Sequence, residues 1–138
     1  VFHSPPISGG GVVVIVEIAN TLAKLGHEVT LLSPTLEWKD KQYNPEINSN
    51  VSIVKTKTPS SSNLKVTARR CKSNLEKKGI ELGKEKEFDF ILTIFHPFHL
   101  VPRAAVNCGK KLGVPVIIKI DDAVYEKSNG IKSIQRSL

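Results

Sequence analysis

The sequence predicts an α/β fold, a Rossmann-like doubly wound parallel sheet with helices on both faces. One observation is a glycine-rich turn, Gly9 to Gly11, placed directly before a strongly apolar helical pattern. A second is that a helical pattern, a glycine and an apolar strand follow one another twice along the chain. A third is that the predicted strands are apolar without alternation, which is typical of parallel strands covered on both faces. These patterns favour βα units wound about one sheet.

The first third of the chain predicts two strands and the helix that joins them. Val1–His3 has the composition of the end of a first strand. Val12–Leu25 is apolar nearly all round, as expected for a helix that is buried on more than one side. Gly26 supplies the left-handed residue that ends such a helix, and Glu28–Ser33 is rich in strand-forming residues.

The middle of the chain predicts two connections around a short third strand. Pro34–Asn50 is long and polar, and it predicts a loop that acts either as a substrate lid or as a simple insertion. Val51–Lys55 is the third strand. Pro59–Asn63 is a turn that ends in a good helix cap, and Leu64–Glu87 is the helix that follows it.

The last part of the chain repeats the pattern of helix, glycine and strand. Phe90–Phe95 is the clearest strand of the sequence, and Leu100–Leu112 is a helix that Gly113 ends. Val114–Ile120 is the last strand. Right-handed crossovers between these strands give the order 3-2-1-4-5, with a switch point between the first and the fourth strand.

Length and composition indicate an ordinary globular domain. The chain has 138 residues, of which 40% are hydrophobic and 24% charged, so residues 1–138 are expected to form one domain. Cys71 and Cys108 lie far apart without a CxxC motif, which predicts buried reduced thiols rather than a metal site. No apolar run reaches the roughly 18 residues of a membrane span, and no signal peptide pattern is present. We therefore expect a soluble, cytoplasmic protein.

The net charge of +7 predicts an acidic partner. Most of the excess positive charge lies in the predicted helix Leu64–Glu87, which contains eight cations and four glutamates. This helix is either a solvated outer face or a surface attracted to anionic membrane lipids. Aromatic residues make up only 6% and do not alternate with basic ones, so nucleic acid is not expected as a partner.

The polar residues that stand out follow the predicted strands at their carboxyl ends, which is the edge where ligands bind in such sheets. His96 follows the fourth strand, and Asp121 and Asp122 follow the fifth. Each also has a purely structural interpretation: a tight turn for the glycines, a strand end for His96, a cap for Asp122. A dinucleotide fingerprint would need a small residue at Val14, and no P-loop or nucleophile elbow is present.

The segment PPISGGG, followed by EIANTLAKLGHEVTLLSP, resembles the opening of the N-terminal domain of family 4 glycosyltransferases. In that family a strand, a Pro-x-x-Gly-Gly loop, a helix and a Leu-Gly-His-Glu-Val segment run in this order. FDFILTIFHPF and LGVPVIIKIDD resemble the family's fourth and fifth strands. The resemblance therefore runs from Val1 to about Tyr125.

The resemblance implies a two-domain GT-B enzyme that moves a sugar from a nucleotide-sugar to an acceptor. The anomeric configuration is retained, and neither a metal nor another cofactor is needed. The resemblance also implies that residues 1–138 are the acceptor-side half, and that the C-terminal half, which holds most of the donor nucleotide, is absent from this sequence. The basic helix favours a lipid-linked or otherwise anionic acceptor.

Site residues follow from the resemblance position by position. Gly9 and Gly10 match loop glycines that face the donor phosphates in the family. Asp122 matches the Asp of the frequent His-Asp pair after the fifth strand, and Asp121 stands in place of the His. Asp121 is therefore the candidate catalytic residue, with a carboxylate where an imidazole lies beside the transferred sugar. The candidate residues for binding substrate or phosphate are Gly9, Gly10, Gly11, His96 and Asp122.

Two other functions use the same fold. One is a stand-alone binding or regulatory module, which would bind no nucleotide-sugar. The other is a different GT-B enzyme such as a nucleotide-sugar epimerase, which would convert free nucleotide-sugar without an acceptor.

Overall fold

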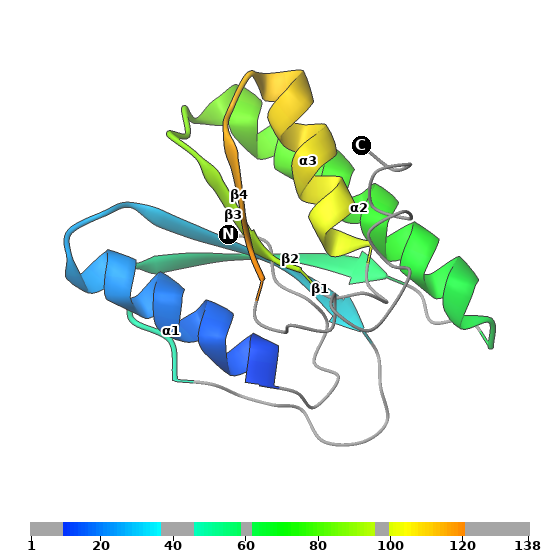
Figure 1. The fold of residues 1–138 in the computed structure, drawn as a ribbon, viewed down its shortest axis with the longest axis horizontal. Helices are drawn as coiled ribbons and strands as arrows, with labels where there is room; N and C mark the ends of the chain where they lie inside the picture. The colour runs from blue at the N-terminus through cyan, green and yellow to red at the C-terminus, as the bar shows by residue number, and fades with distance from the viewer. Residues whose placement is uncertain (1–9, 37–45, 59–61, 96–99, 121–138) are drawn as a thin grey trace.

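A computed structural model describes residues 10–36, 46–58, 62–95 and 100–120 of the chain (Figure 1). Helices and strands alternate as expected for βα units, except that β2 follows β1 directly among the described elements. The elements are α1 Gly10–Lys24, β1 Val29–Leu36, β2 Val51–Thr58, α2 Leu64–Glu85, β3 Ile91–Ile94, α3 Val101–Leu112 and β4 Val116–Lys119.

The four described strands form two parallel pairs. β1 pairs with β2 from Val29 opposite Val51 to Leu36 opposite Thr58. β3 pairs with β4, with Ile91 opposite Val116. The predicted order 3-2-1-4-5 contains both pairings. Its other two neighbour relations involve Val1–His3, which lies outside the described residues, so the full order stays a prediction.

Alternation along the strands places apolar side chains on both faces of the sheet. In β1, Leu31 packs in a cluster with Ala19 and Ala23 of α1. The next residue, Leu32, packs with residues of α2 and α3 on the opposite face. β3 repeats this arrangement, because Leu92 contacts α1 and the preceding residue packs toward α2 and α3.

The helices accordingly form two layers around the strands. Figure 1 shows α1 on one side of the strands and α2 and α3 together on the other. α1 covers both strand pairs, since Ile15 and Val16 contact β3 while the following turns contact β1 and β2. The prediction of parallel strands with helices on both faces is confirmed for the described elements.

Three local predictions at helix ends are confirmed. Gly26 and Gly113 have φ angles of 89° and 71°, the left-handed conformation that glycine adopts without steric cost. Asn63 caps α2, because its side-chain oxygen accepts a hydrogen bond from the Lys65 N–H at 3.0 Å. In each case the physical reason for the prediction from the sequence is the one that the structure shows.

The boundaries of several elements differ from the prediction. α1 begins at Gly10 rather than at Val12, so Gly10 and Gly11 belong to the first helical turn. Glycine costs a helix only about 1 kcal/mol relative to alanine, and burial of the next turn of α1 against the sheet offsets that cost. α2 ends at Glu85 rather than Glu87, because Lys86 adopts an extended backbone while its N–H donates to the Leu82 carbonyl.

The predicted loop after β1 also begins too early. β1 continues through Pro34 to Leu36, and β2 continues past Lys55 to Thr58. The two extensions pair with each other, so each supplies the ladder partners that the other needs. Proline lacks the N–H of a strand interior, which is why Pro34 predicted a strand end.

A buried asparagine holds the chain that enters β2 against α1. The Asn20 side chain, only 9% exposed, donates to the Glu46 carbonyl at 3.0 Å and accepts from the Asn48 N–H at 2.8 Å. These bonds satisfy two backbone groups that no strand or helix partner reaches. Asn20 therefore fixes residues 46–48 on the helix.

We expect Gly109→Ala to destabilise the protein and Gly83→Ala to be tolerated. A Cβ at Gly109 would clash with the Val116 side chain and lie 2.7 Å from the Val114 carbonyl oxygen, which is backbone. Such overpacking costs about 1–3 kcal/mol. A Cβ at Gly83 would meet only the end of the Leu112 side chain, which can rotate away.

Urea unfolding of the two variants measures the difference. Gly83→Ala should stay within about 1 kcal/mol of the original protein, since alanine also gains helix propensity. Equal free energies of unfolding for the two variants would contradict the close approach of α3 to β4.

Candidate functional site

The carboxyl ends of all described strands point to one edge of the molecule. β1 and β2 end at Leu36 and Thr58, and α2 begins a few residues after β2. β3 ends at Ile94 and α3 begins at Val101. Because the strands of each pair are parallel and helices follow β2 and β3, the first turns of α2 and α3 begin at this edge (Figure 1).

The first turn of α1 belongs to the same edge. Ile94, the last residue of β3, packs against the cluster that contains Ile15 and Val16, early in α1. The α1 N-terminus contains Gly10 and Gly11 and has no acidic residue in its first turn. Its backbone N–H groups have no intrahelical acceptor, and the helix dipole is positive there, so the arrangement suits an anion.

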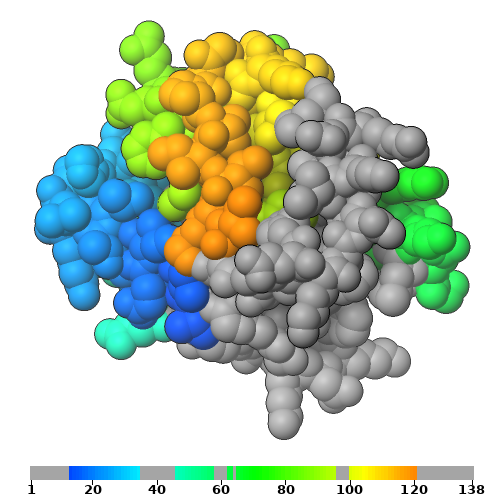
Figure 2. All heavy atoms as spheres, in the orientation of Figure 1, coloured from blue at the N-terminus to red at the C-terminus, as the bar shows by residue number. Residues whose placement is uncertain are grey.

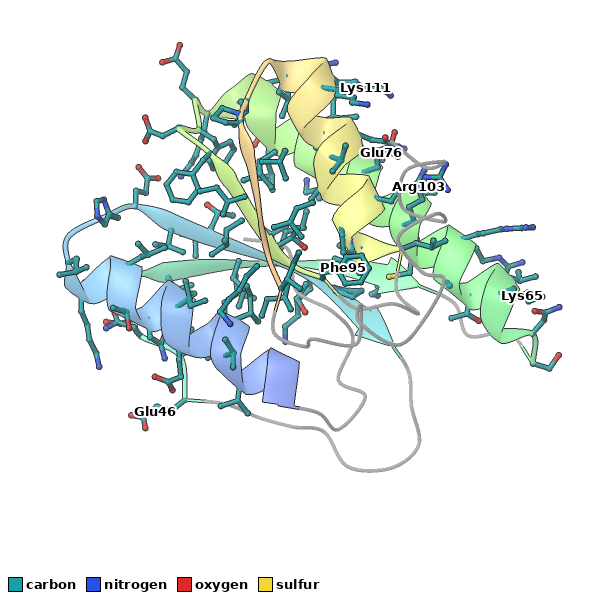
Figure 3. The ribbon with its side chains drawn as sticks, in the orientation of Figure 1. Glu46, Lys65, Glu76, Phe95, Arg103 and Lys111 are labelled. Atoms are coloured by element: carbon teal, nitrogen blue, oxygen red, sulfur yellow. The ribbon has the colours of Figure 1, made fainter. Side chains whose placement is uncertain are left out.

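Other predicted site residues lie outside the described part of the chain, namely Gly9, His96, Asp121 and Asp122. The described residues beside them are informative for two of the four. The Phe95 N–H donates to the Lys119 carbonyl at 2.7 Å, and Phe95 is the residue directly before His96 (Figure 3). Lys119 lies two residues before Asp121. The backbone that leads into His96 and the backbone that leads into Asp121 are therefore neighbours.

An apolar surface is exposed at β4 and directly after it. Ile117 of β4 is 49% exposed, and Ile120, which follows the strand, is 59% exposed. Figure 2 shows β4, in orange, at the surface beside α1, in blue. The unalternated apolar sequence of this strand predicted burial on both faces. One face is instead exposed at Ile117.

A cluster around Glu76 joins α2 to α3. The Glu76 carboxylate accepts hydrogen bonds from Lys72 Nζ and from Asn107 Nδ2, both at 3.0 Å. Lys111 Nζ lies 3.5 Å from its other oxygen. The hydrogen bond from Asn107, followed by the interactions with Lys72, lowers the pKa of Glu76 below its ordinary value. Only the i, i+4 spacing of Lys72 and Glu76 could have been read from the sequence.

The two cysteines pack in the same layer and are not joined by a disulfide. Cys71 and Cys108 are both buried in the cluster beneath α2 and α3, as predicted. Burial, followed by the nearby charge of Glu76, raises the pKa of Cys108 to about 11. A thiol with this pKa is almost fully protonated at neutral pH and is a poor nucleophile or metal ligand.

A hollow of about 200 Å³ lies at the opposite edge, beside the amino ends of β1 and β3. Its walls include Val29, Phe90 and the ion pair between Glu28 and Lys86. Ligands of parallel α/β sheets bind outside the carboxyl ends of the strands. This hollow is therefore separate from the candidate site.

The described residues contain neither a cluster of metal ligands nor a helix that could span a membrane. Within them, no three His, Cys, Asp or Glu side chains gather as the ligands of a metal ion would. No helix in those same ranges combines the length and the apolar composition needed to cross a membrane.

Fold and candidate site together define a parallel α/β domain in which a glycine-initiated helix begins at the edge where the described strands end. The family model described as Glycosyltransferase Family 4 matches residues 8–130. The chain therefore belongs to glycosyltransferase family 4, which confirms the resemblance found in the sequence. No match was found among curated proteins or among solved structures.

The lowered pKa of Glu76 predicts a pH dependence of stability. A carboxylate with a lower pKa in the folded state stabilises the protein fully above its unfolded pKa, which is ordinarily near 4.5. This contribution is lost as the pH falls through the folded value. The difference in free energy of unfolding between the original protein and Glu76→Gln should therefore shrink as the pH drops below about 4.5.

Urea titrations at neutral pH and at several acidic values measure this difference. Glu81→Gln is the matched control, because Glu81 lies on the same helix and pairs only with the partly exposed Lys78 among the described residues. The free energy of unfolding of Glu81→Gln should keep the pH dependence that Glu76→Gln loses. A constant difference between Glu76→Gln and the original protein across the acidic range would contradict the role of Glu76.

Proposed function

We propose that this domain is the acceptor-side part of a retaining glycosyltransferase that transfers a sugar from a nucleotide-sugar to an acceptor. The observation that carries the proposal is the position of α1, which begins with Gly10 and Gly11 at the edge where the described parallel strands end. Membership of family 4 supports the reaction class. The donor nucleotide would be held largely by a second domain, and no metal or other cofactor is required.

The first turn of α1 would act on the diphosphate of the donor. When the bond between the anomeric carbon and the phosphate oxygen breaks, negative charge builds up on the departing diphosphate. Backbone N–H groups at a helix N-terminus stabilise such charge, because they are fixed in place before the reaction begins. Glycine at positions 10 and 11 leaves these donors uncovered by side chains.

The remaining predicted residues would contact the sugars at the same edge. In this proposal Asp121 is catalytic and accepts hydrogen bonds from hydroxyl groups of the transferred sugar. His96 and Asp122 would bind substrate beside it. The neighbouring backbone of Phe95 and Lys119 supports the placement of these segments together.

Gly10→Asp should reduce turnover of the full-length enzyme by about 100-fold or more, the scale of losing one fixed anion donor. The aspartate would repel the diphosphate. Acidic residues in a first turn stabilise helices, so the loss would not arise from unfolding of α1. Gly10→Asn is the matched control, since it has the same shape without the charge, and it should retain much more activity.

Sugar transfer by the intact protein, measured with radiolabelled nucleotide-sugars, tests the proposal. Equal activity of the Asp and Asn variants would remove the diphosphate role of α1. Interconversion of free nucleotide-sugar without acceptor would instead identify an epimerase. Absence of nucleotide-sugar binding in the intact protein would favour a binding module.

The second part of the proposal is that the enzyme works at an anionic membrane surface facing the cytoplasm. Five cations of α2 are exposed and make no ion pair within the described part of the chain. They are Lys65, Arg69, Arg70, Lys77 and Lys84. Exposed cations near a membrane each add roughly 1 kcal/mol of attraction to anionic lipids.

Reversal of Arg69, Arg70 and Lys77 to Glu should abolish co-sedimentation of the intact protein with anionic liposomes. Lys72 is left in place because it binds Glu76. The control reverses Lys24, Lys55 and Lys57, which are exposed on other elements, and it changes the net charge equally. Unchanged co-sedimentation of the α2 variant, or an equal loss in the control, would argue against a membrane surface on α2.

A further inference from the structure

Two facing rows of polar side chains lie along the line where α2 and α3 meet, which is called the α2–α3 groove below. Helical periodicity places Lys65, Arg69, Lys72 and Glu76 on one stripe of α2, at spacings of i, i+4, i+7 and i+11. Arg103, Asn107 and Lys111 form the corresponding stripe of α3, at i, i+4 and i+8.

Contacts at two levels show that these stripes face each other. Glu76 binds Asn107 and Lys111 across the groove. One to two turns further along, Gly83 lies against the Leu112 side chain. The helices therefore run side by side in the same direction, and residues before Glu76 on α2 lie level with residues before Asn107 on α3.

Charge is balanced at one end of this groove and not at the other. Toward the C-terminal ends, Glu76 neutralises part of the charge of Lys72 and Lys111. Toward the N-terminal ends, Lys65, Arg69 and Arg103 are exposed and pair with no carboxylate among the described residues. Figure 3 shows Lys111, Glu76, Arg103 and Lys65 following one another along one side of the molecule.

The unbalanced end lies at the ligand-binding edge. α2 and α3 both begin where β2 and β3 end, and neither has an acidic residue in its first turn. With Glu76 opposite Asn107, α3 begins about level with Arg70, so the positive end of the α3 dipole lies near Arg69 and Arg103, and the positive end of the α2 dipole lies near Lys65. An anion in this position would lie next to the edge to which the proposed function assigns sugar transfer.

We infer that Lys65, Arg69 and Arg103 bind a phosphate or diphosphate group of the acceptor at the N-terminal end of the α2–α3 groove. Arginine binds phosphate oxygens through two parallel N–H groups, and here one arginine comes from each helix. A group with two or more negative charges matches the local excess better than a single carboxylate. The identification of the anion as the acceptor's rests on the proposed function.

This inference differs from attraction of the whole α2 helix to a membrane. Attraction at long range depends on total charge, so every exposed cation of α2 would contribute about equally. Binding at a groove site depends instead on where each cation lies. Arg69 and Arg103 should then matter far more than Arg70 and Lys77, which share a stripe of α2 that is turned away from Glu76.

The first test compares Arg69→Gln with Arg103→Gln against the control pair Arg70→Gln with Lys77→Gln in the intact protein. Both pairs remove the same charge from exposed positions, so neither should unfold the domain. The probes are inorganic pyrophosphate, measured by calorimetry, and vesicles of equimolar phosphatidylcholine and phosphatidic acid. The groove pair should weaken binding at least tenfold, about the effect of one lost charged hydrogen bond, and the control pair should weaken pyrophosphate binding less than about threefold. Because Arg70 and Lys77 belong to the proposed membrane surface, the control pair also weakens vesicle binding, but less than the groove pair does.

The two probes also separate the source of the phosphate. Selective loss of pyrophosphate binding supports a site for a free or exposed phosphate group. Selective loss of vesicle binding alone supports the same site with a lipid headgroup as its ligand. Equal weakening by the two pairs, or no weakening by the groove pair with either probe, would overturn the inference.

A transfer assay distinguishes this inference from the proposed function. With a phosphate-bearing acceptor, the groove pair should raise the KM for the acceptor about tenfold and leave the KM for the nucleotide-sugar unchanged. If the original protein transfers no sugar but pyrophosphate binding still depends on Arg69 and Arg103, the proposed function fails and the anion site stands. If transfer occurs and the acceptor KM is unaffected, the inference fails and the proposed function stands.

Discussion

Burial of both faces of parallel strands is the constraint on which the rest of the structure depends. Consecutive residues such as Leu31 and Leu32 point to opposite faces, so each strand needs a helix on both sides. α1 covers one face of β1, β2 and β3, and α2 with α3 covers the other, while Ile117 of β4 stays exposed. Because each helix must run back along the strands, the helices that follow β2 and β3 begin where those strands end. The position of the candidate site is therefore a consequence of how the core is covered.

The positive electrostatic potential at that edge follows from the same arrangement of helices and strands. Helix N-termini gather there, and each contributes partial positive charge. The carboxylate that could offset this charge, Glu76, lies further along the groove and is occupied by Lys72, Asn107 and Lys111. The domain thus presents an edge suited to anions, from the backbone at Gly10 to the side chain of Arg103. The proposed transfer of a sugar from a nucleotide-sugar to an anionic acceptor would use both properties.

The sequence was sufficient to predict most of the fold and less of the site. Left-handed glycines at Gly26 and Gly113 and the cap at Asn63 act locally, so they were predicted correctly. The extension of β1 through Pro34 depends on pairing with β2, which local propensity does not contain. The facing stripes of α2 and α3 depend on how two helices dock, so Arg103 was not singled out. His96, Asp121 and Asp122 lie outside the described residues, and their roles stay predictions.

The glycine at position 109 has a consequence for how related sequences are compared. Its hydrogen occupies the space between α3 and β4 that any side chain would need, so purifying selection at this position would act on packing alone. The glycines that begin α1 would be retained for a different reason, the approach of a ligand. If both kinds of glycine were invariant among relatives, Gly109 would be invariant because of packing, and Gly10 and Gly11 because of ligand binding. A relative that folds but has lost its activity would keep the first glycine and would be free to replace the other two.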